Sequence, residues 1–87
     1  MIETITIKEV KVQLGLLCQQ FRKQANLSRQ ELSDALSISS NTLLNIENGK
    51  NANLDTVLKI AAHFGQLETI SQLIMQQYNS RATSSLY

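Results

Sequence analysis

The sequence of 87 residues has no proline and no tryptophan, and it contains a single cysteine and a single histidine. A lone Cys18 excludes a disulfide framework and a cysteine-based zinc site, so an intracellular, reducing compartment is expected. With 43% hydrophobic residues but only two Phe and two Tyr, the composition indicates a small, aliphatic, helical domain. A β-sandwich or a disordered chain would have a different composition.

The chain also lacks an excess of charge of either sign, with a formal net charge of +1. A protein that coats DNA without sequence preference would usually be far more basic. No apolar run approaches the ~18 residues of a membrane span. The start, "MIETITIKEV", lacks the basic region and long apolar core of a signal peptide. We therefore expect a soluble, cytoplasmic protein with no membrane partner.

Patterns typical of catalysis are missing as well. There is no glycine-rich phosphate loop, no Cys–His pair at ligand spacing and no defined pair of carboxylates around Glu47. His63 lies on a segment whose other face is apolar, so we expect a surface or partly buried side chain. Cys18 falls on an apolar stripe and is expected to be a small core residue. The prediction is no enzyme, no cofactor and no metal.

What the sequence does contain is a series of helical periodicities. Thr6, Ser28 and Asn53 are positioned to cap helices, and Gly49 and Gly65 to end them. The apolar spacing predicts five helices, over about residues 8–25, 29–36, 40–48, 54–64 and 66–78.

The two ends of the chain lack this helical pattern. Alternating Thr and Ile within residues 1–7 indicate either a short strand or an ordered arm, while residues 81–87 lack periodicity and are expected to be a flexible tail. No repeat or linker divides the chain. We predict one domain over residues 1–80.

The second and third helices are short and separated by a tight turn, which is typical of a helix-turn-helix. Ser33 is small enough to let the two helices approach each other. The angle between them would be filled by Leu32, Leu36, Ile38, Leu43 and Ile46. In this motif the second helix is presented to the DNA major groove.

The stretch "LSRQELSDALSISSNTLLNIENGK", followed by "NLDTVLKIAAHFG", resembles the Cro/repressor-like helix-turn-helix family of xenobiotic-response-element (XRE) regulators. The likeness covers about residues 10–75. It implies an all-α, five-helix, lambda-repressor-like DNA-binding domain. The family usually has glycine where this chain has Ser37, and a left-handed backbone there costs another residue about 1 kcal/mol.

The third helix carries three asparagines, although asparagine is a mediocre helix former. An asparagine carboxamide can pair bidentately with adenine, and a leucine can contact a thymine methyl. The resemblance implies that four residues of this helix read bases, namely Ser40, Asn41, Leu44 and Asn45, with Asn48 at the far end. The alternative is that these residues form a solvated polar face.

Backbone contacts are expected from a second group of residues. Arg29 matches the family position that touches a phosphate, and the further candidates are Ser28, Thr42, Lys50 and Asn51. The resemblance also places Arg22 of the first helix against Glu47, as a structural pair that fixes the angle of the third helix. Because cations are few, one copy should bind weakly, and two copies per site are expected.

The fifth helix brings more apolar residues than one neighbour can cover. The predicted core consists of Leu14, Leu17, Phe21, Leu32, Leu36, Leu43, Ile46, Leu58 and Ala61. Beyond it, Leu67, Ile70, Leu73, Ile74, Met75 and Tyr78 form a wide stripe. Such a stripe predicts a homodimer interface at Leu67, Ile70, Leu73, Ile74 and Tyr78. The alternative is a monomer in which this helix folds onto the first and fourth helices.

The leading functional hypothesis is a sequence-specific repressor that occupies a palindromic DNA operator as a dimer. The alternative is an interaction module, such as the antitoxin of a toxin–antitoxin operon, which binds a toxin or other protein partner and autoregulates its operon.

Overall fold

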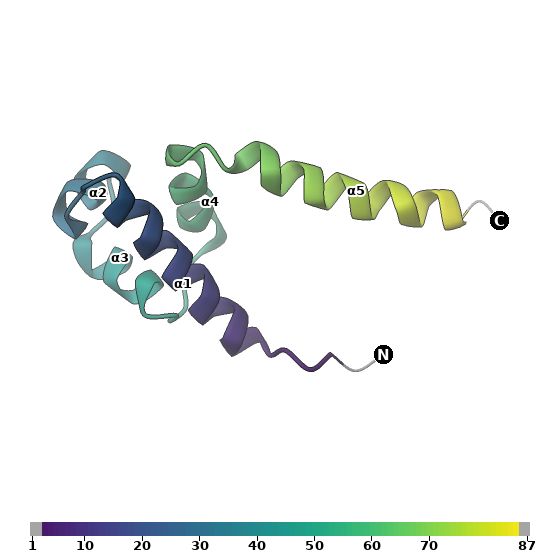
Figure 1. The fold of residues 1–87 in the computed structure, drawn as a ribbon, viewed down its shortest axis with the longest axis horizontal. Coiled ribbons are helices and arrows are strands. Elements are labelled where there is room, and N and C mark those ends of the chain that lie inside the picture. The colour runs from purple at the N-terminus through teal and green to yellow at the C-terminus, as the bar shows by residue number, and fades with distance from the viewer. Residues whose placement is uncertain (1–2, 86–87) are drawn as a thin grey trace.

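The computed structural model describes residues 3–85, with side chains described as far as residue 82, and it is built of five helices with no strand in that range (Figure 1). They are α1 (Ile7–Gln24), α2 (Arg29–Leu36), α3 (Ser40–Glu47), α4 (Leu54–His63) and α5 (Leu67–Ser85). The all-α, five-helix prediction is confirmed. No helix in this range combines the length and apolar character needed to cross a membrane.

The first four helices start at polar caps, as predicted for α1, α2 and α4. The Thr6 hydroxyl accepts a hydrogen bond from the Glu9 N–H at 3.0 Å, and the Asn53 side chain accepts one from the Thr56 N–H at 2.8 Å. Ser28 forms a complete capping box with Glu31 at the start of α2, and Ser39 caps α3. These bonds satisfy backbone amides that lack an intrahelical partner, so they fix where each helix begins.

The two ends of the chain differ from the prediction. Residues 3–6 form no strand, because Thr6 caps α1 and Ile7 already begins the helix; Ile2 lies outside the described residues. At the other end, α5 continues to Ser85, past residue 81, where the tail was expected to begin. Residues 79–85 contain no proline or glycine, so nothing stops a helix that is already propagating.

The buried core lies where α1 to α4 meet. It consists of Cys18, Leu32, Leu43, Ile46 and Ile60, with Leu27, Leu36, Ile38 and Phe64 packed against it. The close approach of α1 to α3 requires Gly15, since a Cβ at that position would lie 2.5 Å from the Ile46 carbonyl oxygen. Gly49, with φ of +75°, turns the chain out of α3 as predicted.

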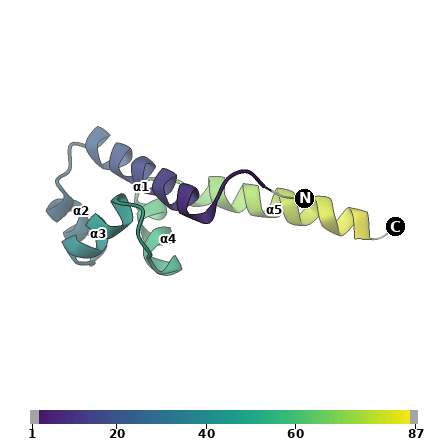
Figure 2. The ribbon, with the colours of Figure 1, turned by 90° about the horizontal axis from the view of Figure 1, so that it is seen from below.

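The prediction that Leu14 and Leu17 belong to the buried core is wrong. Leu14 and Leu17 are 48% and 46% exposed, because α5 packs against α4 at its start and then extends away from the other helices. α1 and α5 project from the α2–α4 end as two separate arms (Figure 1). Seen from below, α2, α3 and α4 lie together on one side of α1, and α5 runs away from them (Figure 2). The chain therefore measures 51 × 26 × 21 Å.

Ser37, in the turn between α2 and α3, has the left-handed backbone that the family's glycine would adopt, with φ of 55° and ψ of 43°. Ser37→Gly should raise the free energy of unfolding by about 0.5–1 kcal/mol, because glycine avoids the Cβ penalty of this conformation. Asn26, with φ of 58°, provides the matched control, since asparagine tolerates the left-handed region.

Urea denaturation of Ser37→Gly and Asn26→Gly variants measures both effects. Only the serine position should gain stability. Equal responses at the two positions would contradict a strained turn at Ser37.

Candidate nucleic-acid interface

The turn between α2 and α3 is held by hydrogen bonds around a fully buried serine. The Ser33 hydroxyl donates to the Arg29 carbonyl at 2.6 Å, and the Ser33 carbonyl accepts from the Ile38 N–H at 3.0 Å. Ser33 is small, so α2 and α3 pack closely across Leu32 and Leu43, which are both fully buried. The orientation of α3 is therefore fixed by packing on one side and by the turn at one end.

The opposite face of α3 is polar and accessible. Ser40, Asn41 and Leu44 are exposed and Asn45 is partly exposed, whereas Leu43 and Ile46 point into the core. The structure thus brings all four residues that were predicted to read bases onto one surface of one helix. Asn48 has a separate position, as the C-cap residue of α3.

The carboxylate of Glu47 is the electrostatic centre of this region. Arg22 donates to both of its oxygens, from Nε to Oε2 at 2.7 Å and from Nη2 to Oε1 at 3.2 Å. A third donor of the same guanidinium, Nη1, bonds the Leu27 carbonyl at 2.9 Å. The predicted contact is therefore present and joins α1, α3 and the loop before α2. The hydrogen bond to Glu47 raises the pKa of Arg22 above its ordinary value, so the arginine stays charged.

A second arginine shares the same carboxylate, which the sequence reasoning missed. Arg29 donates from Nε to Glu47 Oε1 at 2.9 Å, and its side chain is 42% exposed. Two guanidinium groups on one buried carboxylate leave one positive charge in excess, near the start of α2. No sequence spacing signals this contact, because residues 29 and 47 meet only when the two helices cross.

The remaining phosphate candidates lie at the borders of this surface. The Ser28 hydroxyl is engaged in its capping box, and the Thr42 and Ser39 hydroxyls are 2.7 Å apart. Lys50 is exposed. Asn51 accepts a hydrogen bond from Lys11 of α1, a cation that the sequence analysis did not include.

Glu31 and Cys18 show how local surroundings shift ionisation in this fold. Hydrogen bonds from Ser28, the backbone N–H first, lower the pKa of the Glu31 carboxyl. Burial, with a smaller contribution from Glu47, raises the pKa of the Cys18 thiol to about 11, so it is neutral at pH 7.

His63 packs edge-on against Phe64, with ring centroids 4.9 Å apart. Within the described part of the chain, no group of His, Cys, Asp and Glu could hold a metal ion.

The two arginines should contribute very differently to stability. Arg22→Ala leaves the buried Glu47 carboxylate with one partly exposed partner, and we expect a loss of about 3–5 kcal/mol in the free energy of unfolding. Arg29→Ala is the matched control at the same carboxylate, and its cost should stay below about 1 kcal/mol because its side chain is partly solvated. Chemical denaturation monitored by circular dichroism measures both, and equal losses would show that burial does not decide the outcome.

Comparison with known families agrees with this geometry. A model of the helix-turn-helix family, which has the Cro/repressor type of motif found in XRE regulators, matches residues 19–72. The match covers the C-terminal end of α1, all of α2, α3 and α4, and the first residues of α5. No curated protein matches the chain. The matched segment contains the buried turn, the Glu47 cluster and the exposed face of α3.

Proposed function

Because this DNA-binding regulator belongs to the Cro/repressor-type helix-turn-helix family, we propose that it is a sequence-specific repressor that binds a palindromic operator as a homodimer. The observation that carries the proposal is the exposed face of α3, where Ser40, Asn41, Leu44 and Asn45 lie together on a helix fixed by a packed turn. A polar face held this firmly can present hydrogen-bonding groups to base edges in a single register.

The dimensions and chemistry of α3 suit the major groove. An α-helix with its side chains is ~10–12 Å across, which fits the ~12 Å width of that groove, and the eight residues of α3 give it a length of ~12 Å. Asn41 and Asn45 lie one turn apart, so both carboxamides can face adenine edges, while Leu44 can contact a thymine methyl. The Ser40 hydroxyl at the entry of the helix can donate to or accept from a neighbouring base.

Phosphate contacts would hold this face in place. The Nε of Arg29 donates its hydrogen bond to Glu47, so the two terminal amino groups of the guanidinium are the ones that can reach a phosphate from the start of α2. Lys50 and Asn51 on the loop after α3, and Ser28 and Thr42 at the starts of the helices, are the other proposed contacts. Glu47 thus accepts hydrogen bonds from two arginines, Arg22 in the core and Arg29 at the edge of the proposed DNA surface.

Two copies per operator follow from the low charge and the apolar surplus of one chain. A net charge of +1 supplies little attraction to DNA, and a second copy doubles the contacts. The predicted interface on α5 is available, since Leu73, Ile74 and Tyr78 are more than half exposed, Leu67 is nearly half exposed and Ile70 is partly buried. A two-fold axis there would place two α3 helices against successive major grooves, about 34 Å apart.

Substitutions on α3 and α2 should weaken binding in different ways. Asn41→Ala or Asn45→Ala should cost on the order of 1–3 kcal/mol at the operator and relax base preference at one position. Arg29→Ala should weaken binding to all sequences alike and reduce the slope of affinity against salt by about one, because a phosphate contact is lost. Asn48→Ala, the same change at the end of the same helix, should leave base preference unchanged.

Gel-shift titrations test this at several salt concentrations, with the DNA upstream of the protein's own gene and with random DNA. Base-reading asparagines would show selective loss on the upstream DNA. If the Asn41 and Arg29 variants lose affinity for both DNAs equally, α3 does not read the sequence and the proposal fails.

A further inference from the structure

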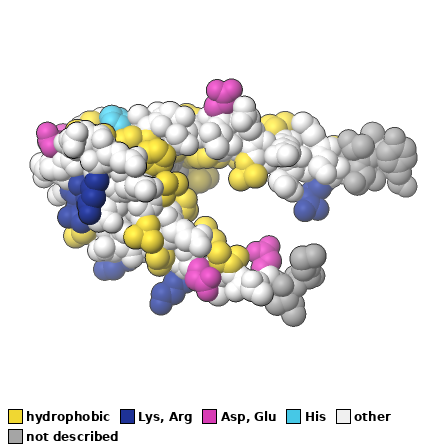
Figure 3. Space-filling view, in the orientation of Figure 1, with side chains coloured by type: hydrophobic (Ala, Val, Ile, Leu, Met, Phe, Trp, Pro, Cys, Tyr) yellow, Lys and Arg dark blue, Asp and Glu magenta, His cyan; other side chains and the backbone are white. Residues whose placement is uncertain are grey.

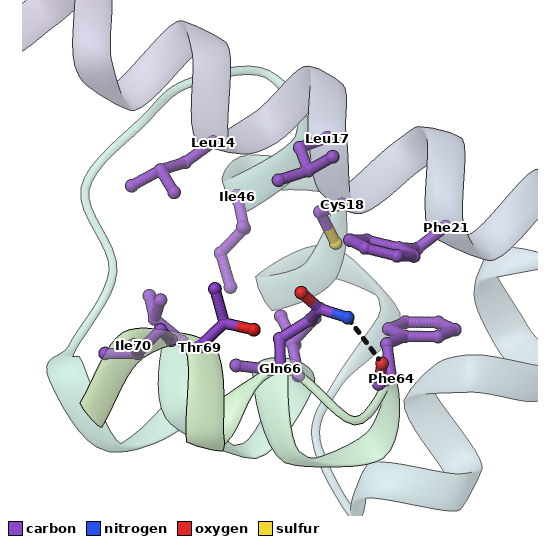
Figure 4. A pocket seen from close by; sticks show the side chains of 12 residues that line it. Leu14, Leu17, Cys18, Phe21, Ile46, Phe64, Gln66, Thr69 and Ile70 are labelled. Carbon is purple, nitrogen blue, oxygen red and sulfur yellow. Dashed lines mark hydrogen bonds between the residues drawn. The ribbon is translucent and has the colours of Figure 1, made fainter. Parts of the chain in front are cut away.

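A groove of about 220 Å³ opens between α1, α4 and the first turn of α5 (Figure 4). Ile46, from the buried face of α3, also lines it, so the groove lies on the side of α3 opposite its exposed face. Twelve residues line it, and ten of them are hydrophobic. Leu14, Leu17 and Phe21 of α1 face Thr69 and Ile70 of α5 across the opening (Figure 4). No charged side chain contributes to the lining, so the groove suits an apolar occupant.

The apolar surface continues beyond the groove along both arms. On α1, Ile7 and Val10 extend the line of Leu14 and Leu17 at helical spacing, and all four are exposed. On α5, Leu73 and Ile74 follow Ile70 by three and four residues, so they extend its line along the helix, and both are more than half exposed. Hydrophobic side chains accordingly gather on the inside of the gap between the arms (Figure 3).

The helix that best fits this groove is α5 itself, but from another copy of the chain. It has 19 residues, a length of ~28 Å, and only Glu68 and Arg81 are charged. A helix with so few charges and an apolar stripe is the type that lies in a hydrophobic groove. The chain's own α5 already forms one wall through Thr69 and Ile70, so its later turns cannot also fill the space.

We propose that the groove between α1 and α5 of each copy receives α5 of a second copy. Each α5 stays attached to its own α4 at its start and inserts its later turns into the partner, and we call this reciprocal insertion the exchange. The inference rests on the homodimer of the proposed function and specifies its interface. Exchange is self-complementary, because each copy offers one groove and one helix, and two copies satisfy both. In this arrangement Leu17, on the α1 wall of the groove, faces the apolar stripe of the partner's α5, which carries Leu73 and Ile74.

The size of the surface agrees with a dimer. Of the twelve groove residues, Cys18, Ile46 and Ile60 are already buried in the single chain, which leaves nine that a partner can contact. Six more large apolar side chains are exposed along the two arms, namely Ile7, Val10, Leu67, Leu73, Ile74 and Tyr78. These accessible apolar residues could form the centre of a standard-size interface, to which each partner contributes roughly 20 residues including a polar rim. Neither the groove nor these six positions include a charge that would be buried without a partner.

Cross-linking between two copies that carry a cysteine at different positions tests the exchange. Both variants carry Cys18→Ala, so that each has one cysteine. Leu17→Cys protein is mixed with Leu73→Cys protein and then oxidised, and we expect a disulfide-linked heterodimer to form rapidly. Leu16→Cys is the matched control: it is exposed, at 57%, but lies about 100° around α1 from Leu17 and should give several times less product.

Sedimentation gives a second readout that does not depend on a disulfide. The wild type and Leu16→Asp should sediment as dimers at micromolar concentration, whereas Leu17→Asp should be monomeric because it places a charge in the interface. Leu17 is half exposed in the single chain, so the substitution should leave the fold intact, as its circular dichroism would show. A monomeric wild type overturns the exchange and leaves the groove to another protein.

The outcomes separate the exchange from the repressor function. A dimer that binds the operator but cross-links only between two Leu73→Cys copies overturns the exchange and leaves the repressor proposal standing. Rapid Leu17–Leu73 cross-linking in a protein without operator preference supports the exchange and overturns the repressor.

Discussion

The buried carboxylate of Glu47 is the interaction on which the DNA-facing half of the molecule depends. It stands at the end of α3, and it binds Arg22 of α1 at 2.7 Å and Arg29 of α2 at 2.9 Å. Three helices are therefore tied at one point. A buried charge is stable only when its partners surround it, so any change in the angle of α3 would leave Glu47 unsatisfied. No buried side-chain polar atom lacks a hydrogen-bond partner in the described part of the chain.

This arrangement divides the molecule into two surfaces with different chemistry. One is polar and small: the exposed side of α3, with Arg29 and Lys50 at its borders. The other is apolar and larger, and it follows α1 and α5 away from the core. Gly15 serves both, since it lets α1 approach the end of α3 while Leu14 and Leu17 face the groove. Separating the surfaces would allow two copies to associate without covering the face proposed to read DNA.

Much of the fold was predictable because its signals are local. Thr6, Ser28 and Asn53 could be identified as caps since each acts within three residues of itself, and the turn at Ser37 was expected from the spacing of two short helices. The positions of Asn41, Leu44 and Asn45 on one face of α3 follow from helical periodicity. The Arg29–Glu47 bond, the Lys11–Asn51 bond and the exposure of Leu17 were not predictable, because each depends on where whole helices lie.

The sequence by itself determined where helices begin, which residues share a face and which family the motif resembles, because these properties depend on neighbours a few positions apart. The tertiary structure decided how α5 leaves the core. The pattern of Leu67, Ile70 and Ile74 shows that this helix must bury an apolar face, but periodicity does not say against what. In the structure α5 packs on α4 only at its start, so the apolar stripes of α1 and α5 face each other across an open groove. The surplus hydrophobicity therefore lies on the surface of the single chain, where contact with another copy can cover it.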